Sequence, residues 1–205
     1  MGTISSRFLA CGLGCLLMLA GCITLPRVDE ALQTLRATPS CCSGLDRLPY
    51  QFLPVGHART HEIDRASPAF QFPEGKSYFL AFRIAEPDKA LRLYVGSYYA
   101  GDIFMPMLTL LDERFDVVRQ VQAGEFQRVE ARGRYQFGNT LQLEPGDSVR
   151  YLIVHTPSNE LGRFHDTPTV GTGVMAGGVV AMSGGGAMRR NHSPFGKIRV
   201  ELSDR

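Results

Sequence analysis

The feature that most constrains the fold is a change in hydrophobic period. From about residue 77 onward, apolar residues recur at every second position, as in SYFLAFRI (77–84) and ALRLYV (90–95). Successive side chains of a β-strand point to opposite faces, so a period of two predicts strands with one apolar face. These two segments are therefore predicted to be half-buried strands.

Further strand signals follow in close succession. FMPMLTLLD (104–112) is apolar on both faces apart from Thr109, which predicts a strand covered on both sides, with Pro106 at its start or at an edge. Other segments with strand character, separated by turn residues such as those of Glu144–Asp147, are FDVVRQV (115–121), RYQFGNTLQL (134–143), SVRYLIVHT (148–156) and GKIRVEL (196–202). Many short strands with almost no helix between them predict an antiparallel β-sandwich of the jelly-roll or immunoglobulin-like kind.

The N-terminus reads as a secretion signal. Arg7 is followed by an apolar run that ends at LAGC, with Cys22 as the cysteine. The LAGC sequence resembles the lipobox of bacterial lipoproteins, in which the cysteine sulfur is acylated and becomes the first residue of the mature chain. Residues 1–21 are then the signal, and Cys22 carries the lipid. The alternative is an ordinary cleaved signal in which Cys22 is incidental.

A lipid anchor predicts a location and a division of the chain. Acyl chains hold a protein to a membrane that it does not span, and Ile23 instead of aspartate after the cysteine favours the periplasmic face of the outer membrane. Residues 22–48 are predicted to be a linker with a short amphipathic helix in VDEALQTLRAT (28–38), stopped by Pro39. Residues 49–205 are predicted to form the sandwich. The formal net charge of +2 falls to +1 without the signal and gives no reason to expect nucleic acid.

Cys41 and Cys42 are the thiols left in the mature chain besides Cys22. An oxidising periplasm permits a disulfide between them. Their Cα atoms are only about 3.8 Å apart across a trans peptide, so the ring would be small and strained. Two free or externally paired thiols are the alternative, and no neighbouring ligand favours a metal.

The segment Val170–Met188 breaks the strand pattern, since it holds seven glycines and no charged residue. We interpret it as an apolar, hairpin-like loop that joins the last two strands. Membrane contact and partner docking are the alternatives. Gly171 and Gly173 lack the strand–turn–helix context of a dinucleotide-binding loop.

No catalytic motif is evident, and we predict neither an enzyme, a cofactor nor a metal site. The sequence holds no G-x-S-x-G elbow, H-E-x-x-H helix or Walker A loop. His57 and His61 lie on one face of an extended strand, but two ligands fall short of a site. His165 with Asp166 lacks a motif serine to complete a triad, and His155 is better placed to cap a strand.

Several segments together resemble the MalM family, maltose-operon periplasmic proteins and their lipoprotein relatives. In order these are CC (41–42) with LPYQFLP, FQFPEGKSYFLAFRI, FMPMLTLLDERF, YLIVHT and HSPFGKIRVEL, which span residues 38–202. The resemblance implies a β-rich periplasmic accessory protein linked to maltose or maltodextrin uptake, with no catalytic residues to carry over.

Two functions remain open at this stage. In the first, a non-enzymatic accessory lipoprotein binds carbohydrate, and Tyr94, Tyr98 and Tyr99 in RLYVGSYYAGD stack on sugar rings. In the second, a structural or assembly lipoprotein of the envelope docks a protein partner through a sheet edge or the glycine-rich segment. The tyrosines also suit plain packing on a sheet.

Overall fold

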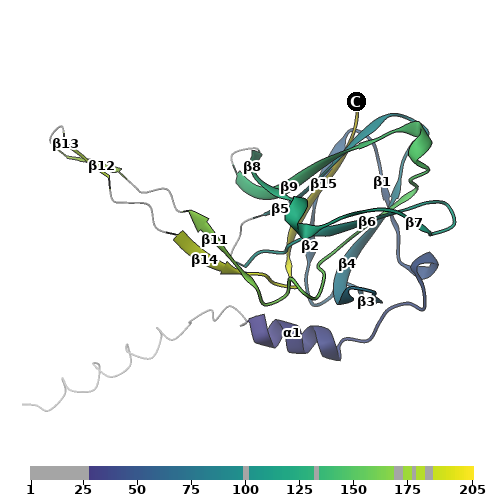
Figure 1. Cartoon of the computed structure of the whole chain (residues 1–205), viewed down its shortest axis with the longest axis horizontal. Helices are drawn as coiled ribbons and strands as arrows, with labels where there is room; N and C mark the ends of the chain where they lie inside the picture. Colours follow the sequence, from purple (N-terminus) through teal and green to yellow (C-terminus); the bar gives the residue numbers. More distant parts are fainter. Residues whose placement is uncertain (1–27, 99–101, 132–133, 169–172, 177–178, 183–186) are drawn as a thin grey trace, which may run out of the picture.

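The protein is mainly β in the computed structural model, which describes residues 28–98, 102–131, 134–168, 173–176, 179–182 and 187–205 (Figure 1). The described residues include an α-helix, α1 (Val28–Ala37), and the 3-10 turns η1 (Leu45–Arg47), η2 (Ala123–Glu125) and η3 (Pro145–Asp147). The strands are β1 (Gln51–Leu53), β2 (His57–Ile63), β3 (Ala69–Phe72), β4 (Gly75–Ile84), β5 (Leu91–Tyr98), β6 (Met107–Leu111), β7 (Val117–Val121), β8 (Gln127–Ala131), β9 (Arg134–Leu143), β10 (Tyr151–His155), β11 (Phe164–Pro168), β12 (Gly173–Ala176), β13 (Val179–Met182), β14 (Ala187–Asn191) and β15 (Gly196–Asp204).

Two sheets form the body of the molecule, and the predicted β-sandwich is confirmed. One sheet has the strand order β1-β4-β10-β6-β7, with β3 also paired to β4, and the other has the order β2-β15-β5-β9-β8. The strand pairs are antiparallel except that β1 runs parallel to β4. The C-terminal strand β15 therefore lies in the interior of its sheet, between β2 and β5.

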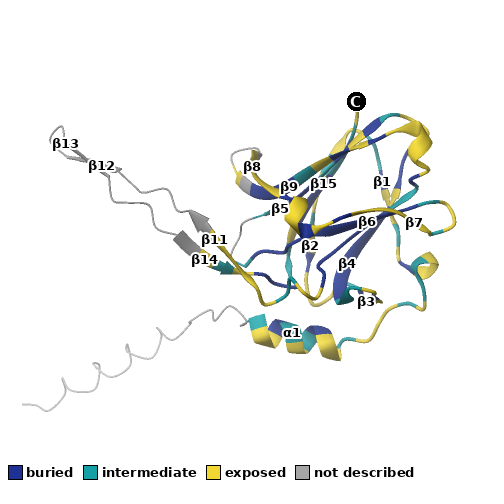
Figure 2. Ribbon diagram, viewed as in Figure 1, coloured by how far each residue is buried: buried dark blue, intermediate teal, exposed yellow. Residues whose placement is uncertain are grey.

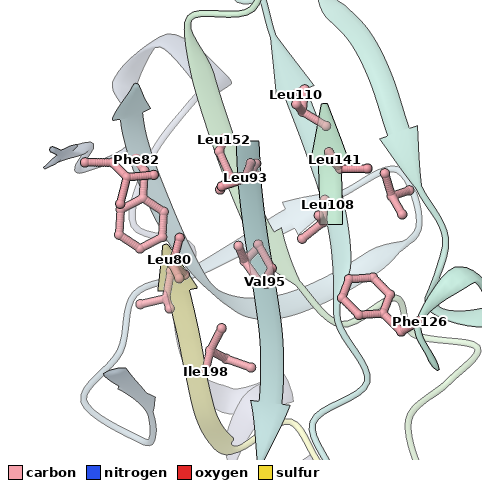
Figure 3. Close-up of a cluster of buried hydrophobic side chains, with 14 of the residues drawn as sticks. Leu80, Phe82, Leu93, Val95, Leu108, Leu110, Phe126, Leu141, Leu152 and Ile198 are labelled. Atoms are coloured by element: carbon pink, nitrogen blue, oxygen red, sulfur yellow. The ribbon is translucent and has the colours of Figure 1, made fainter. Parts of the chain in front are cut away.

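The core lies between the two sheets and comes from the alternating residues of the sequence. Figure 3 shows side chains from β4, β5, β6, β9, β10 and β15 that meet there, among them Leu80, Phe82, Leu93, Val95, Leu108, Leu110, Leu141, Leu152 and Ile198. Each fully buried aliphatic or aromatic side chain contributes about 1.5–3 kcal/mol relative to an exposed one. The hydrophobic alternation thus sets which face of each strand turns inward.

β4 differs from its prediction, because both of its faces are buried. Tyr78, Leu80, Phe82 and Ile84 face the main core as expected. The opposite face carries Phe79 and Ala81, which join a second cluster with Leu48, Phe72, Leu111 and Ile153 on the outer side of the sheet. The segment around η1 and β3 supplies the cover, so a half-buried strand was the wrong prediction for β4 (Figure 2).

The predicted N-terminal helix is present but packs differently from a linker. Ala31 and Leu35 of α1 are buried, and Leu35 reaches the main core. The hydroxyl groups of Thr38 and Tyr78 lie 2.9 Å apart and join the end of the helix to β4. Residues 28–48 therefore pack against the sandwich, whereas the sequence interpretation placed them outside it.

The prediction for the buried strand after Pro106 is confirmed. β6 starts directly after the proline, and all five of its residues are buried, Thr109 included. Since proline lacks the N–H that a central strand needs, its place before the first ladder bond leaves the pairing of β6 with β7 and β10 intact.

Four strands outside the sandwich form a projection that we call the arm. β11 pairs with β14, and β12 pairs with β13, each as a two-stranded antiparallel ladder. Figure 1 shows the β12–β13 ladder at the far end of the arm, well away from the two sheets. The glycine-rich segment interpreted as a hairpin-like loop thus contains strands. Among the described residues, no helix has the length and apolar character needed to cross a membrane.

Candidate functional site

The outward side of the second sheet gathers five side chains that we call the outer tyrosine face: Tyr94, Tyr98, Gln136, Arg199 and Glu201. Tyr94 and Tyr98 lie on β5, and their inward neighbours Leu93, Val95 and Ser97 are buried. The register places Glu201 of β15 opposite Tyr94 and Gln136 of β9 opposite Tyr98. Side chains from three adjacent strands therefore meet on one surface.

A pair of glycines shapes this surface. Gly96 and Gly138 lie opposite each other on β5 and β9, and the hydroxyl end of the Tyr94 ring lies over both of them. A Cβ atom added to Gly96 would stand 2.5 Å from the Tyr94 hydroxyl, and one added to Gly138 would stand 2.7 Å from it. The Tyr94 hydroxyl also donates to Gln136 Oε1 at 3.0 Å. Because neither glycine has a Cβ atom, the Tyr94 ring can lie flat along the sheet. Its hydroxyl group is held there by the hydrogen bond to Gln136.

Arg199 is the buried charge of the face, with its side chain only 8 % exposed. It donates to the Glu201 carboxylate in a close ion pair, and its guanidinium carbon is 6.0 Å from the centroid of the Tyr94 ring. Burial opposes the charge, but the hydrogen bond and the charge of Glu201, aided by Tyr98, raise the pKa of Arg199. A buried charge that keeps such a partner remains ionised, and the pair is fixed in place.

The face offers chemistry suited to a polyhydroxylated ligand. Tyr94 and Tyr98 are half-buried, so part of each ring meets solvent. The Tyr98 hydroxyl lies 3.4 Å from Thr60 Oγ1 of β2. Aromatic rings supply flat apolar surface, and the Glu201 carboxylate beside them is an acceptor for hydroxyl groups. Gln136 and Arg199 are buried beneath this surface and hold Tyr94 and Glu201 in place. Tyr99, the third tyrosine predicted to take part, lies outside the described residues.

Sequence reasoning found the tyrosines but missed their polar partners. In the sequence, Arg199 and Glu201 stand at the polar positions of the strand segment GKIRVEL, and Gln136 belongs to no motif. The sequence holds a signal for the face, namely the glycines at 96 and 138 on two strands. The meaning of these two glycines can be recognised only when the register of β5 with β9 and β15 is known.

The cysteines predicted to carry covalent chemistry fall in two places. Cys22, the predicted lipid attachment point, lies outside the described residues. Cys41 and Cys42 are joined to each other by a disulfide. The Cys41 N–H donates to the carbonyl of Ala69 at 2.8 Å, and Cys42 packs against the second cluster. The pair therefore lies on the cover of the first sheet, far in the chain from the outer tyrosine face.

The histidine pair on β2 does not form a metal site in the described part of the chain. His57 is exposed, whereas His61 turns its ring edge toward Phe82, with centroids 5.0 Å apart. Burial, aided by the charge of Arg59, lowers the pKa of His61. No group of three or more His, Cys, Asp or Glu residues among the described ones is placed to hold a metal ion.

The other two histidines considered in the sequence, His165 and His155, pack against aromatic rings. His165 on β11 is exposed and meets the ring of Phe137 edge-on at 4.9 Å. His155 ends β10 as expected and is fully buried; its ring stacks on Phe72 at 4.0 Å, and its Nε2 lies 3.5 Å from Thr109 Oγ1. Burial lowers the pKa of His155 to about 4, so the ring is neutral at pH 7.

A hydrogen-bonded cluster that could not be predicted from the sequence lies where the arm meets the body. Nδ1 of the buried His192 lies 3.0 Å from the Glu160 carboxylate, which also receives a hydrogen bond from Arg163 at 2.9 Å. Burial lowers the pKa of His192, although the charge of Glu160 opposes that shift. These contacts fix the loop before β11 to the end of β14.

The fold and the face define a class: a small β-sandwich with a polar, aromatic outer sheet. The comparison with family models is more specific. Residues 74–170 match the model described as maltose operon periplasmic protein precursor (MalM), and this match supports membership of that family. The family is periplasmic and is not a known enzyme family. The match covers β4 to β11 and ends where the glycine-rich segment begins. Searches among curated proteins and among solved structures found no match.

Proposed function

We propose that this protein is a non-enzymatic accessory lipoprotein, anchored through Cys22 to the periplasmic face of the outer membrane, that binds carbohydrate of the maltodextrin class. The observation that carries the proposal is the outer tyrosine face, where two half-buried tyrosines adjoin the ion pair between the buried Arg199 and the partly exposed Glu201. Membership of a family named for the maltose operon supports the choice of carbohydrate.

The two tyrosines contribute differently to the proposed binding surface. Tyr94 lies along the sheet over the glycine pair and has its hydroxyl engaged by Gln136, so its ring is a fixed platform. Tyr98 is held at its hydroxyl by Thr60 and lies beside Arg199. A sugar ring placed on this surface would stack on tyrosine and donate hydrogen bonds to the Glu201 carboxylate, whose side chain is 31 % exposed. A prearranged surface of this kind loses little side-chain entropy on binding.

Calorimetric titration with maltodextrins of increasing length tests the proposal. Tyr98→Ala should weaken binding about tenfold, which corresponds to roughly 1.4 kcal/mol. Tyr98→Phe is the matched control, because it keeps the ring and should retain most of the affinity. Tyr151→Ala alters a half-buried tyrosine of the other sheet and should leave binding unchanged. Absence of any binding by the wild-type protein, or equal losses for Tyr98→Ala and Tyr151→Ala, would contradict the proposal.

The anchor is tested separately by metabolic labelling with a fatty acid. Cys22→Ala should leave an unprocessed precursor that accepts no label, because the proposal places the acyl chains on this sulfur. Labelling of the mutant at the wild-type level would end the lipoprotein interpretation. It would leave the carbohydrate proposal standing.

A second candidate function is the docking of an envelope protein at the edge strand β7. This strand pairs with β6 on one side and ends the sheet on the other. Val117 and Val118 are 54 % and 44 % exposed, and an exposed apolar edge is a template for an added strand. Val118→Lys would block such pairing, so loss of a crosslinked envelope partner in this variant, with maltodextrin binding absent, would favour the second function.

A further inference from the structure

The fold does not show what contacts the tip of the arm. β12 and β13 pair only with each other among the described strands. An isolated two-stranded hairpin is marginally stable in water and needs a third strand or a packed face. Figure 1 shows this ladder at the tip of the arm, away from the core of the sandwich. The described strands thus give this ladder neither a third strand nor a facing sheet.

The residues of the ladder restrict what that surface is. All eight belong to the types Gly, Ala, Val and Met, so neither face of the ladder carries a polar residue. A hairpin that lies on another protein normally alternates, with one apolar face and one polar face toward water. A second copy of the chain paired at an edge would satisfy backbone groups but would leave both apolar faces in water. A lipid layer covers both faces at once.

The charge pattern along the arm changes sharply at its base. From Val170 to Met188 the sequence carries no charged residue, and Arg189 and Arg190 follow immediately. The guanidinium of Arg189 lies over the ring of Phe164, with its carbon 3.1 Å from the ring centroid. Phe164 is 51 % exposed. An exposed aromatic ring beside a cation suits the level of the lipid headgroups, where one part is apolar and the other is hydrated.

The arm also leaves the body on the side that the proposed anchor approaches. Leu32 of α1 lies within 3.8 Å of the position that a Cβ on Gly162 would take, directly before β11. Figure 1 places the first residues of α1 and the base of β11 and β14 on the same side of the molecule. Five residues lie between Cys22 and Val28, so the six steps from Cα to Cα reach at most about 20 Å. An acylated Cys22 thus keeps this side close to the membrane.

We propose that the tip of the arm, strands β12 and β13, inserts into the lipid surface next to the anchor. The four residues of each strand span roughly 13 Å, which is slightly more than the interfacial depth of about 5–10 Å and falls well short of the hydrocarbon core of about 30 Å. The outer edges of the ladder keep access to headgroups and water, which an open sheet edge requires. The position of the arm rests on the proposed anchor, whereas its affinity for lipid rests on its own residues.

Because the chain contains no tryptophan, the fluorescence of a single introduced tryptophan reports only on its own surroundings. A single tryptophan is introduced at the arm tip, Val180→Trp, or at an exposed apolar position of the body, Val118→Trp. The full-length protein, purified from membranes, is reconstituted into vesicles of phosphatidylethanolamine and phosphatidylglycerol with brominated acyl chains. Tryptophan at 180 should lose roughly half of its fluorescence, since it lies at the acyl boundary, whereas tryptophan at 118 should lose almost none. Adding Met175→Asp should abolish the loss at 180.

Flotation of the vesicles separates the two proposals. Protein that floats while tryptophan 180 is unquenched would overturn the inserted arm and leave the anchor intact. Equal quenching at 118 and 180 would also overturn it, because the whole body would then lie on lipid. Quenching at 180 in protein that lacks fatty acid would support the arm and refute the anchor. A blue shift at 180 that depends on protein concentration without vesicles would replace lipid with a second copy.

Discussion

The strands of the body bury alternate residues against the facing sheet, whereas the strands of the arm tip pair only with each other in the described part of the chain. Val200 in β15 illustrates the first case, since it is fully buried in the core while its neighbours Arg199 and Glu201 form the polar outer face. β12 and β13 illustrate the second, since their eight residues lack any alternation between polar and apolar types. The same kind of backbone ladder therefore has a different stabilising partner in each region.

This difference separates stability from attachment. The body is held by apolar area that leaves water when the chain folds, so its substitutions change the free energy of unfolding. The two strands of the arm tip pair only with each other among the described strands, so their substitutions are expected to change what the protein touches. The predictions below test this separation, starting with the largest expected change in stability.

Phe82→Ala is expected to be the most destabilising of these changes. Phe82 of β4 is 1 % exposed and lies between the two sheets (Figure 3). Removing a buried aromatic ring costs about 3–5 kcal/mol, because transfer energy is lost and a cavity remains. Urea unfolding followed by circular dichroism measures the effect. Phe52→Ala, at an exposed position of neighbouring β1, is the control and should change the unfolding free energy little.

Acidification is expected to destabilise the body through His155. Burial lowers its pKa in the folded state to about 4, below the ordinary value near 6.5 for an unfolded chain. The unfolded state therefore binds a proton first as pH falls, and stability is complete above pH 6.5 and declines toward pH 4. The shift corresponds to about 3 kcal/mol.

The measurement is the slope of unfolding free energy against pH between 6.5 and 4. His155→Phe should reduce this slope whatever it does to stability at pH 7, because the titrating group is gone. His61 and His192 also have lowered pKa values and should leave a smaller residual slope. An unchanged slope in His155→Phe would show that other groups govern the acid response.

The features of the body that could be predicted from the sequence are those that depend on local residue patterns. The class of fold, the helix at 28–37 and the inward faces of β5, β9 and β15 were predictable, because alternation is a local property of each segment. The second cover over β4 was not, because it depends on Leu48 and Phe72 arriving from elsewhere in the chain. Alternation within β4 itself was too weak to indicate it, since Phe79 and Ala81 are apolar as well.

The candidate site was predictable only in part for a related reason. Tyr94 and Tyr98 are visible as aromatic residues on one face of a strand. Arg199 looked like an ordinary exposed cation, yet it is buried, because Glu201 two residues further on the same strand gives it a partner. Cross-strand register decides which side chains share a surface, and register is set by long-range pairing.

The Cys41–Cys42 disulfide is expected to contribute little to the stability of the body. A bond between adjacent residues closes a very small loop, so it removes little entropy from the unfolded chain. Replacing both cysteines with serine should lower the melting temperature by only a few degrees, equivalent to roughly 1 kcal/mol or less. Differential scanning calorimetry of wild type and double variant tests this. Loss of cooperative unfolding would show that the disulfide is needed to hold the cover over the first sheet.

The smallest change in stability is expected from shortening the arm. Replacing Thr172–Ala187 with a short Gly-Ser turn leaves β11 and β14 to pair beside the body and leaves the core of the two sheets untouched. Shortening a connection changes the entropy of loop closure slowly, by about 0.6 kcal/mol for each halving of its length. The unfolding free energy and the strand content by circular dichroism should therefore match those of the wild type, while lipid contact at the arm is lost.

A matched internal control is Phe82→Ala in the shortened chain, which should cost as much unfolding free energy as in the full chain because the two regions are independent. Collapse of the fold on shortening, or a changed cost of Phe82→Ala, would mean that the apolar residues of β12 and β13 contribute to the stability of the sandwich, and the distinction between body and arm would fail.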